Sequence, residues 1–174
     1  MKKLILSTLL VASSLISAEL TNLKTISSNF TQLITNSSHN TIKYQGKMYA
    51  KKQDNLALWI YTSPIEKKIY YRDGDIVILE PDLEQVTFAK LNKVPNIITI
   101  LKSAKKVSKN KLIATFNKTK YTITVNGDKV QRISYQDEMQ NNVSIRFSNV
   151  KTNKDIKDDL FIYEIPAGYD VLKQ

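Results

Sequence analysis

The chain has 174 residues, a length that fits one domain, and it contains no cysteine and one histidine. The lack of cysteine excludes disulfides, thiolate catalysis and most zinc sites. The net charge of +10 suits an anionic surface, an acidic partner or nucleic acid, or it is simply the charge of a solvated surface.

The first 18 residues have the layout of a secretory signal peptide. Met1-Lys2-Lys3 is positively charged, residues 4–16 form an apolar run, and Ser17-Ala18 ends in a small side chain. The run is shorter than the roughly 20 apolar residues that a transmembrane helix needs. We therefore predict a cleaved signal peptide at residues 1–18 and a single exported domain at residues 19–174. Export argues against nucleic acid as a partner.

Residues 20–33 are predicted to form a helix. Leu20, Leu23, Ile26, Phe30 and Leu33 recur at spacings of three and four, which places them on one helical face. The other face consists of asparagine, serine and threonine, which are weak helix formers. Such a helix depends on packing against another element.

From residue 41 the pattern changes to strands. Ile42, Tyr44, Met48 and Ala50 alternate with polar neighbours at the period of two that a half-buried strand requires. Asp73-Gly74 is a strong hairpin signal. The short gaps predict an antiparallel meander, with further strands at residues 56–62, 68–72, 76–80 and 84–90.

A second helix is predicted to begin at Pro95, because proline suits the first helical turn. Ile97, Ile98 and Leu101 form its apolar stripe, and a lysine-rich stretch at residues 102–120 follows. Further strands are predicted at residues 112–116, 121–125, 130–135, 143–147 and 160–165.

About ten consecutive strands in one sheet must twist and curl, which leaves a concave face in need of cover. The predicted helices are the available cover. The predicted fold class is mainly β (α+β), namely an incomplete antiparallel β-barrel, or strongly curled sheet, with a lid of two or three helices over a hydrophobic cavity.

Motifs for catalysis and for metal or cofactor binding are missing from the sequence. His39 stands in a polar loop, and no serine has a Gly-x-Ser-x-Gly setting. Asp155, Asp158 and Asp159 lack the spacing of an EF-hand calcium loop. We therefore predict no enzyme, no metal site and no cofactor.

The predicted strands are rich in aromatic side chains, including Trp59, Tyr61 and Phe88. Two interpretations fit this enrichment: the filled core of an ordinary barrel, or the wall of a ligand cavity. The pattern alone favours the filled core.

Several short landmarks follow one another in a fixed order along the exported chain. The first are Phe30-Thr31-Gln32, a strand from Gly46 to Lys52, and an apolar strand closed by Ser63-Pro64. The next are Asp73-Gly74, the turn at residues 81–86, the helix at residues 95–101, and the segments 142–147 and 161–171. In this order, and without cysteine, they resemble the outer-membrane lipoprotein carrier family, LolA.

The resemblance implies a partial barrel with a helical lid over a hydrophobic cavity for acyl chains. It implies a carrier in the periplasm with acylated lipoproteins as cargo. It also implies an inner-membrane ABC-type transporter that loads the carrier and an outer-membrane receptor that unloads it. We expect a monomer.

Four sets of functional residues are predicted with the help of this resemblance. The sheet side of the cavity is assigned to Tyr44, Met48, Trp59, Tyr61, Ile78 and Phe88. The lid is assigned to Leu23, Ile26, Phe30, Ile97, Ile98 and Leu101. Docking on an acidic transporter or on anionic headgroups is assigned to Lys102, Lys105, Lys106 and Lys109, with a solvated loop as the alternative. Lys52 is the candidate for a lid latch.

The latch assignment rests on a departure from the family pattern. Relatives often carry an Arg-Pro pair here, whose arginine holds the lid closed, but this chain has Lys51-Lys52-Gln53. A lysine cannot make the planar fork of hydrogen bonds that an arginine makes. Two other functions stay open from sequence: an exported amphiphile-binding or sensor module of the same fold that does not transport lipoproteins, and a periplasmic hydrolase.

Overall fold

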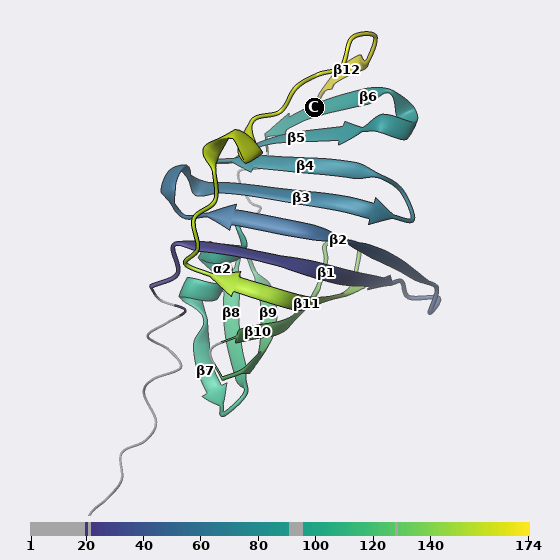
Figure 1. Cartoon of the computed structure of the whole chain (residues 1–174). Coiled ribbons are helices and arrows are strands. Elements are labelled where there is room, and N and C mark those ends of the chain that lie inside the picture. Colours follow the sequence, from purple (N-terminus) through teal and green to yellow (C-terminus); the bar gives the residue numbers. More distant parts are fainter. Residues whose placement is uncertain (1–19, 21, 91–95, 128) are drawn as a thin grey trace, which may run out of the picture.

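The computed structural model describes residues 20, 22–90, 96–127 and 129–174 (Figure 1). The predicted signal peptide and Pro95 lie outside these residues. One curled sheet of 12 strands forms the body of the molecule. In sheet order its strands are β12 (Asp170–Lys173), β6 (Gln85–Lys90), β5 (Asp75–Glu80), β4 (Lys67–Arg72), β3 (Leu56–Ser63), β2 (Thr41–Lys51), β1 (Thr25–Thr35), β11 (Asn142–Thr152), β10 (Lys129–Gln136), β9 (Thr119–Asn126), β8 (Lys111–Phe116) and β7 (Lys105–Ser108).

Two meanders make up this sheet rather than one. Strands β1 to β6 form the first and β7 to β11 the second, and they join where β1 pairs antiparallel with β11. Strand β1 is therefore central, with Phe30 opposite Gly46 on one side and Phe147 on the other. The predicted hairpin at Asp73-Gly74 is confirmed, since it connects β4 to β5 and both residues have positive φ.

The predicted N-terminal helix is wrong, because residues 25–35 form strand β1. Ile26, Ser28, Phe30 and Gln32 are buried in strict alternation. The four-residue spacing of Ile26 and Phe30 is an even number, so it fits one face of a strand as well as one face of a helix. Threonine and isoleucine favour strands, and the neighbouring serines and asparagine favour helices only weakly.

One α-helix is complete within the described residues, α2 (Ile97–Ser103), so a lid of two or three helices is not supported. Its buried face is formed by Ile97, Ile98, Ile100 and Leu101. The helix lies on the concave side of the sheet and contacts β8 and β2. The described residues also include three 3-10 turns: η1 (Gln53–Asn55), η2 (Pro81–Leu83) and η3 (Asp158–Phe161).

The C-terminal segment differs from the predicted strand at residues 160–165. After β11 the chain crosses the convex face, where η3 places Phe161 and the nearby Ile156 against Leu56 and Leu58 (Figure 1). The chain then reaches β12, which pairs parallel with β6. Within the predicted strand, Leu160 and Phe161 therefore pack across the strands of the sheet, whereas Ile162 and Ile165 are exposed.

None of the helices in the described part of the chain is long and apolar enough to cross a membrane.

Candidate apolar cavity

A cavity of about 410 Å³ lies on the concave face, between α2 and the sheet. Its volume falls in the range of small-molecule sites, roughly 300–1,000 Å³. Strand alternation builds the wall, because every second residue of a strand points to the same face. On β3 these residues are Ala57, Trp59 and Tyr61. The other large apolar lining residues are Ile69, Tyr71, Ile76, Ile78, Ile97, Ile100, Tyr121, Ile133, Tyr135 and Ile145.

Aromatic rings stack edge to face along one side of this wall. The Phe30 ring centroid lies 5.0 Å from that of Trp59 and 5.1 Å from that of Tyr61, at interplanar angles of 71° and 76°. The Tyr44 ring lies 5.7 Å from the Tyr61 ring. Such pairs are favourable beyond the area they bury, so they hold the wall in one arrangement.

The lining offers few polar groups and no charged side chain. The Tyr61 hydroxyl donates to Oε1 of Gln32 at 3.0 Å. Burial raises the pKa of Tyr61 above its usual range, and burial together with Tyr121 and Asp137 raises the pKa of Tyr135 to about 12. Both hydroxyls therefore stay neutral at physiological pH, and the wall suits an uncharged apolar guest rather than acid–base chemistry.

The predicted cavity residues lie in three different places. Trp59, Tyr61 and Ile78 line the cavity, and Tyr44 lies beside Tyr61. Met48 does not line it, because its side chain is fully buried in the core. Phe88 lies on the opposite face of the sheet, where it contacts Tyr163. Alternation along β6 explains the error, since Ala89 and not Phe88 faces the cavity.

The predicted lid residues are also divided. Ile97 lines the cavity, whereas Ile98 and Leu101 lie on the buried face of α2 and pack into the main core. Ile26 and Phe30 belong to β1, and Leu23 precedes that strand, buried in the same core. These last three residues are therefore part of the sheet and its core rather than of a helical lid.

Sequence reasoning missed Asn96, the buried residue that precedes α2. Its Oδ1 accepts a hydrogen bond from the backbone N–H of Ile98 at 3.0 Å, which caps the helix. Its Nδ2 donates to the backbone oxygen of Leu56 on β3, also at 3.0 Å. Asparagine is among the best N-cap residues, so its place directly before the apolar stripe was the available signal.

Lys52 lies at the end of β2, where its backbone N–H donates to the oxygen of Lys24 at 2.8 Å. Its side chain meets Lys102 at the end of α2, and this contact with a second amine lowers the pKa of Lys102. In the described part of the chain, the Lys52 side chain makes no hydrogen bond to a carbonyl of α2. The neighbouring Lys51 instead forms an ion pair with Asp158.

The lysines predicted for docking gather around the edge strand β7. Lys105 and Lys106 lie on β7 and Lys109 in the turn to β8, all exposed, and Lys102 lies on α2. Residues 85–127 hold nine lysines and no acidic residue. Within the described residues none of these four lysines forms an ion pair. Among the described residues, this end of the sheet therefore presents lysines that are not paired with an acid.

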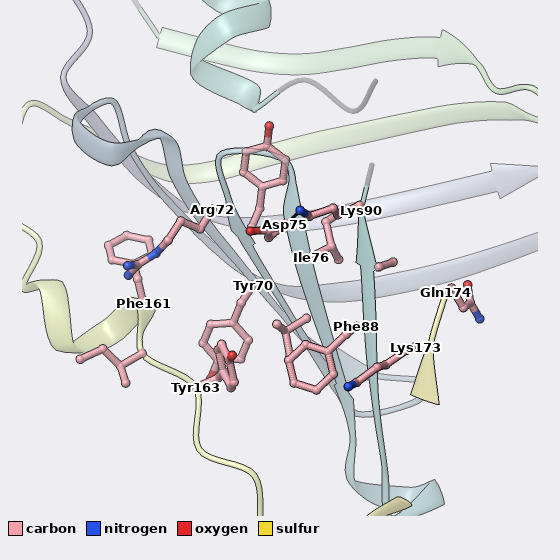
Figure 2. A pocket seen from close by; sticks show the side chains of 14 residues that line it. Tyr70, Arg72, Asp75, Ile76, Phe88, Lys90, Phe161, Tyr163, Lys173 and Gln174 are labelled. Atoms are coloured by element: carbon pink, nitrogen blue, oxygen red, sulfur yellow. Dashed lines mark ion pairs between the residues drawn. The ribbon is translucent and has the colours of Figure 1, made fainter. Parts of the chain in front are cut away.

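A second, more open hollow of about 710 Å³ involves the convex face (Figure 2). Tyr163 lies over Tyr70 and Phe88 there, with ring centroids 5.9 and 5.8 Å away. Its other lining residues include cations and an acid, Arg72, Lys90, Lys173 and Asp75, and the Lys90 amine pairs with Asp75 at 3.8 Å. This mixture of charges selects no class of ligand, so the apolar cavity is the better candidate site.

Comparison with known proteins identifies the family. Residues 21–113 match the family model described as outer membrane lipoprotein carrier protein LolA. A Campylobacter jejuni protein named outer-membrane lipoprotein carrier protein is 38% identical over 173 residues, which cover 99% of this chain and all of that protein. The chain belongs to the LolA family. A protein of the same name from Helicobacter pylori strain HPAG1 is 36% identical over 89% of this chain and 83% of its own length.

Solved structures agree with the LolA fold. A LolA superfamily protein from Nitrosomonas europaea superposes with a TM-score of 0.52 at 13% identity, over 85% of this chain and 96% of its own. An uncharacterized conserved protein from Thermus thermophilus superposes with a TM-score of 0.55 at 10% identity, over 91% of this chain and 97% of its own. At such low identity these likenesses concern the fold alone.

Proposed function

We propose that this protein is a non-enzymatic carrier that binds the acyl chains of lipoproteins released from the inner membrane and delivers them to the outer membrane. The observation that carries the proposal is the concave cavity, which is lined by apolar and aromatic side chains and by no charged one. Membership of a family described as outer membrane lipoprotein carriers supports the same function.

The energetics explain why such a carrier is needed. Each methylene group moved from water into an apolar site gains about 0.8 kcal/mol. A lipoprotein with two or three long acyl chains therefore loses tens of kcal/mol if it leaves a bilayer for water alone, on the same scale of about 0.8 kcal/mol per methylene. The cavity wall, with Trp59, Tyr61 and Ile78, replaces part of that lost burial. Helix α2 is the element that covers the chains: Ile97 and Ile100 line the cavity, and Ile98 and Leu101 pack into the core.

The partners follow from this route. The proposed cargo is an acylated lipoprotein, the loading partner is an inner-membrane ABC-type transporter, and an outer-membrane receptor accepts the cargo. The signal peptide at residues 1–18 sends the single domain of residues 19–174 to the periplasm, where it acts as a monomer. A basic surface docks on an acidic face of the transporter; it is formed by Lys102, Lys105, Lys106 and Lys109. Lys52 adds its positive charge next to Lys102.

Binding of a synthetic triacylated cysteine peptide tests the cargo. Trp59 is the only tryptophan and lines the cavity, so its fluorescence reports occupancy. We expect the acylated peptide to shift the Trp59 emission with saturation at one peptide per protein, and the same peptide without acyl chains to leave it unchanged. Equal responses to both peptides would contradict acyl-chain binding.

A charge inside the cavity provides the matched variant. Ile78 is half-buried in the cavity wall, so Ile78→Glu places a carboxylate where the acyl chains would lie without removing a core side chain. We expect affinity for the acylated peptide to fall at least about tenfold, since burying a carboxylate costs more than about 1.4 kcal/mol. Met139→Glu, at an exposed position in the turn between β10 and β11, is the control and should bind as the natural protein does.

A further inference from the structure

The amide of Asn96 joins two parts of the molecule that must separate if α2 moves. Asn96 is 4% exposed and lines the cavity. Its Oδ1 receives the N–H of Ile98 and its Nδ2 reaches the oxygen of Leu56. The first bond lies within the helical segment, whereas the second crosses from that segment to β3. Lifting α2 from the sheet therefore breaks the second bond and leaves the first intact.

Apart from the contact between the Lys52 and Lys102 side chains at the far end of the helix, the contact between α2 and the sheet is apolar in the described part of the chain. Ile97, Ile98, Ile100 and Leu101 pack into the main core, together with residues of β8 and β2. Apolar contacts are non-directional, so acyl chains can replace them with little loss. A hydrogen bond from a buried amide has no such substitute, because an acyl chain offers neither donor nor acceptor. The Leu56 oxygen and the Asn96 amide would both be left unpaired.

From this asymmetry we propose that Asn96 is a positioning residue that latches α2 over the cavity, through the single bond from its Nδ2 to the Leu56 oxygen. The bond sets how often the cavity opens. It acts equally on the empty and the filled cavity, so it governs the rates of entry and exit more than the affinity. The link to lipoprotein exchange rests on the proposed function, but the latch itself does not.

Two variants separate the latch from the helix cap. In Asn96→Ser the hydroxyl still accepts from the helix N–H, because serine is as good an N-cap as asparagine, but it is too short to reach Leu56 as well. In Asn96→Asp the carboxylate keeps the cap and cannot donate to the Leu56 oxygen. Thr99→Gly is the control, since Thr99 is exposed on α2 and its loss weakens the helix without touching the latch.

The first measurement uses the apolar fluorophore N-phenyl-1-naphthylamine, followed by energy transfer from Trp59. We expect the association and dissociation rates of both Asn96 variants to rise by about five- to tenfold, as loss of one hydrogen bond predicts, with the dissociation constant within about twofold of the natural value. Thr99→Gly should change neither rate. A residue that merely lines the cavity would raise the dissociation rate alone, and that outcome, or unchanged rates, would overturn the latch.

The second measurement needs no ligand. Amide hydrogen exchange of α2 should be faster in Asn96→Ser than in Thr99→Gly, since the latch holds the whole helix against the sheet. Equal protection in the two variants would overturn the proposal. If the natural protein fails to bind the fluorophore while Asn96→Ser still loosens α2, the latch stands and the proposed cavity function falls.

Discussion

Tyr61 joins the cavity wall to the central strand, because its ring meets Phe30 and its hydroxyl donates to Gln32, both on β1. The Lys67 amine lies 4.9 Å from the centre of the Tyr61 ring and 5.4 Å from that of Tyr44. A cation over an aromatic face is favourable where water is partly excluded. Single residues of this kind fix the wall without adding charge to the cavity interior.

The buried tyrosines predict a loss of stability in alkali. An unfolded tyrosine ionises near pH 10, whereas burial raises the pKa of Tyr135 to about 12 and that of Tyr61 further. Above pH 10 the unfolded chain therefore releases protons first, and the free energy of unfolding falls as the pH rises towards the folded pKa.

Urea unfolding at pH 9 and at pH 11.5 measures this loss. We expect a lower unfolding free energy at pH 11.5, and a smaller drop in Tyr135→Phe, because phenylalanine cannot ionise. The same drop in the natural protein and in Tyr135→Phe would contradict the assignment to Tyr135.

Gly46 is required by a close approach between strands. A Cβ atom at this position would lie 1.9 Å from the backbone oxygen of Ile60 and 2.9 Å from Cε1 of Phe30. Gly46→Ala should therefore lower the free energy of unfolding by at least about 2 kcal/mol, the cost of forced overpacking. The urea midpoint measures it, with exposed Lys47→Ala as the control within about 0.5 kcal/mol. An alanine variant as stable as the natural protein would show that the strands separate at no cost.

At the scale of elements, strand β1 is the seam between the two meanders. Leu33 pairs with Lys43 on β2 and with Ser144 on β11, while its side chain is 38% exposed. Leu33→Pro therefore tests the backbone rather than the core, since proline removes the N–H from a central strand. We expect it to lower the free energy of unfolding by about 3 kcal/mol or more.

Val107→Pro is the matched control, because Val107 is 55% exposed and lies at a register shift of the edge strand β7. It should cost less than about 1 kcal/mol, since proline is tolerated on edge strands and at bulges. Comparable urea midpoints for the two proline variants would contradict the central place of β1.

The sequence predicted strands β2 to β6, strands β8 to β11 and helix α2 because their signals are local. Alternation located β2, and the Asp73-Gly74 pair located a hairpin. The nature of β1 was missed because the spacing of Ile26 and Phe30 fits two periods, and the pairing of β1 with β11 is a contact between distant segments that no local pattern encodes. Phe88 was placed in the cavity because alternation along β6 defines two faces without telling which of them is concave. The bond from Asn96 to β3 was missed because its partner Leu56 is 40 residues away.

At the scale of the whole molecule, charge is unevenly distributed. The described lysines around β7 and at the end of α2 form no ion pair, whereas Lys51 pairs with Asp158 of the C-terminal segment and lies near Asp155. Unpaired lysines on one side raise the association rate with an acidic partner by long-range attraction. We propose that this asymmetry orients the protein as it approaches an acidic transporter.

Charge reversal tests that orientation. Replacing Lys105, Lys106 and Lys109 with glutamate should slow loading from transporter-bearing membranes at least about tenfold, with a weaker dependence on salt. Reversing the exposed Lys43, Lys47 and Lys68 changes the net charge equally and should leave the loading rate near its natural value. Equal slowing by both triple variants would mean that net charge, and not this surface, governs loading.

The central claim is that the protein takes acylated lipoproteins out of a membrane. The most direct test adds purified residues 19–174 to spheroplasts of the source organism that display a labelled lipoprotein destined for the outer membrane. We predict release of the label into the soluble fraction as a complex of one lipoprotein with one carrier, in a reaction that needs ATP. Retention of the label in the membrane, with the added protein folded and the transporter active, would contradict the carrier function.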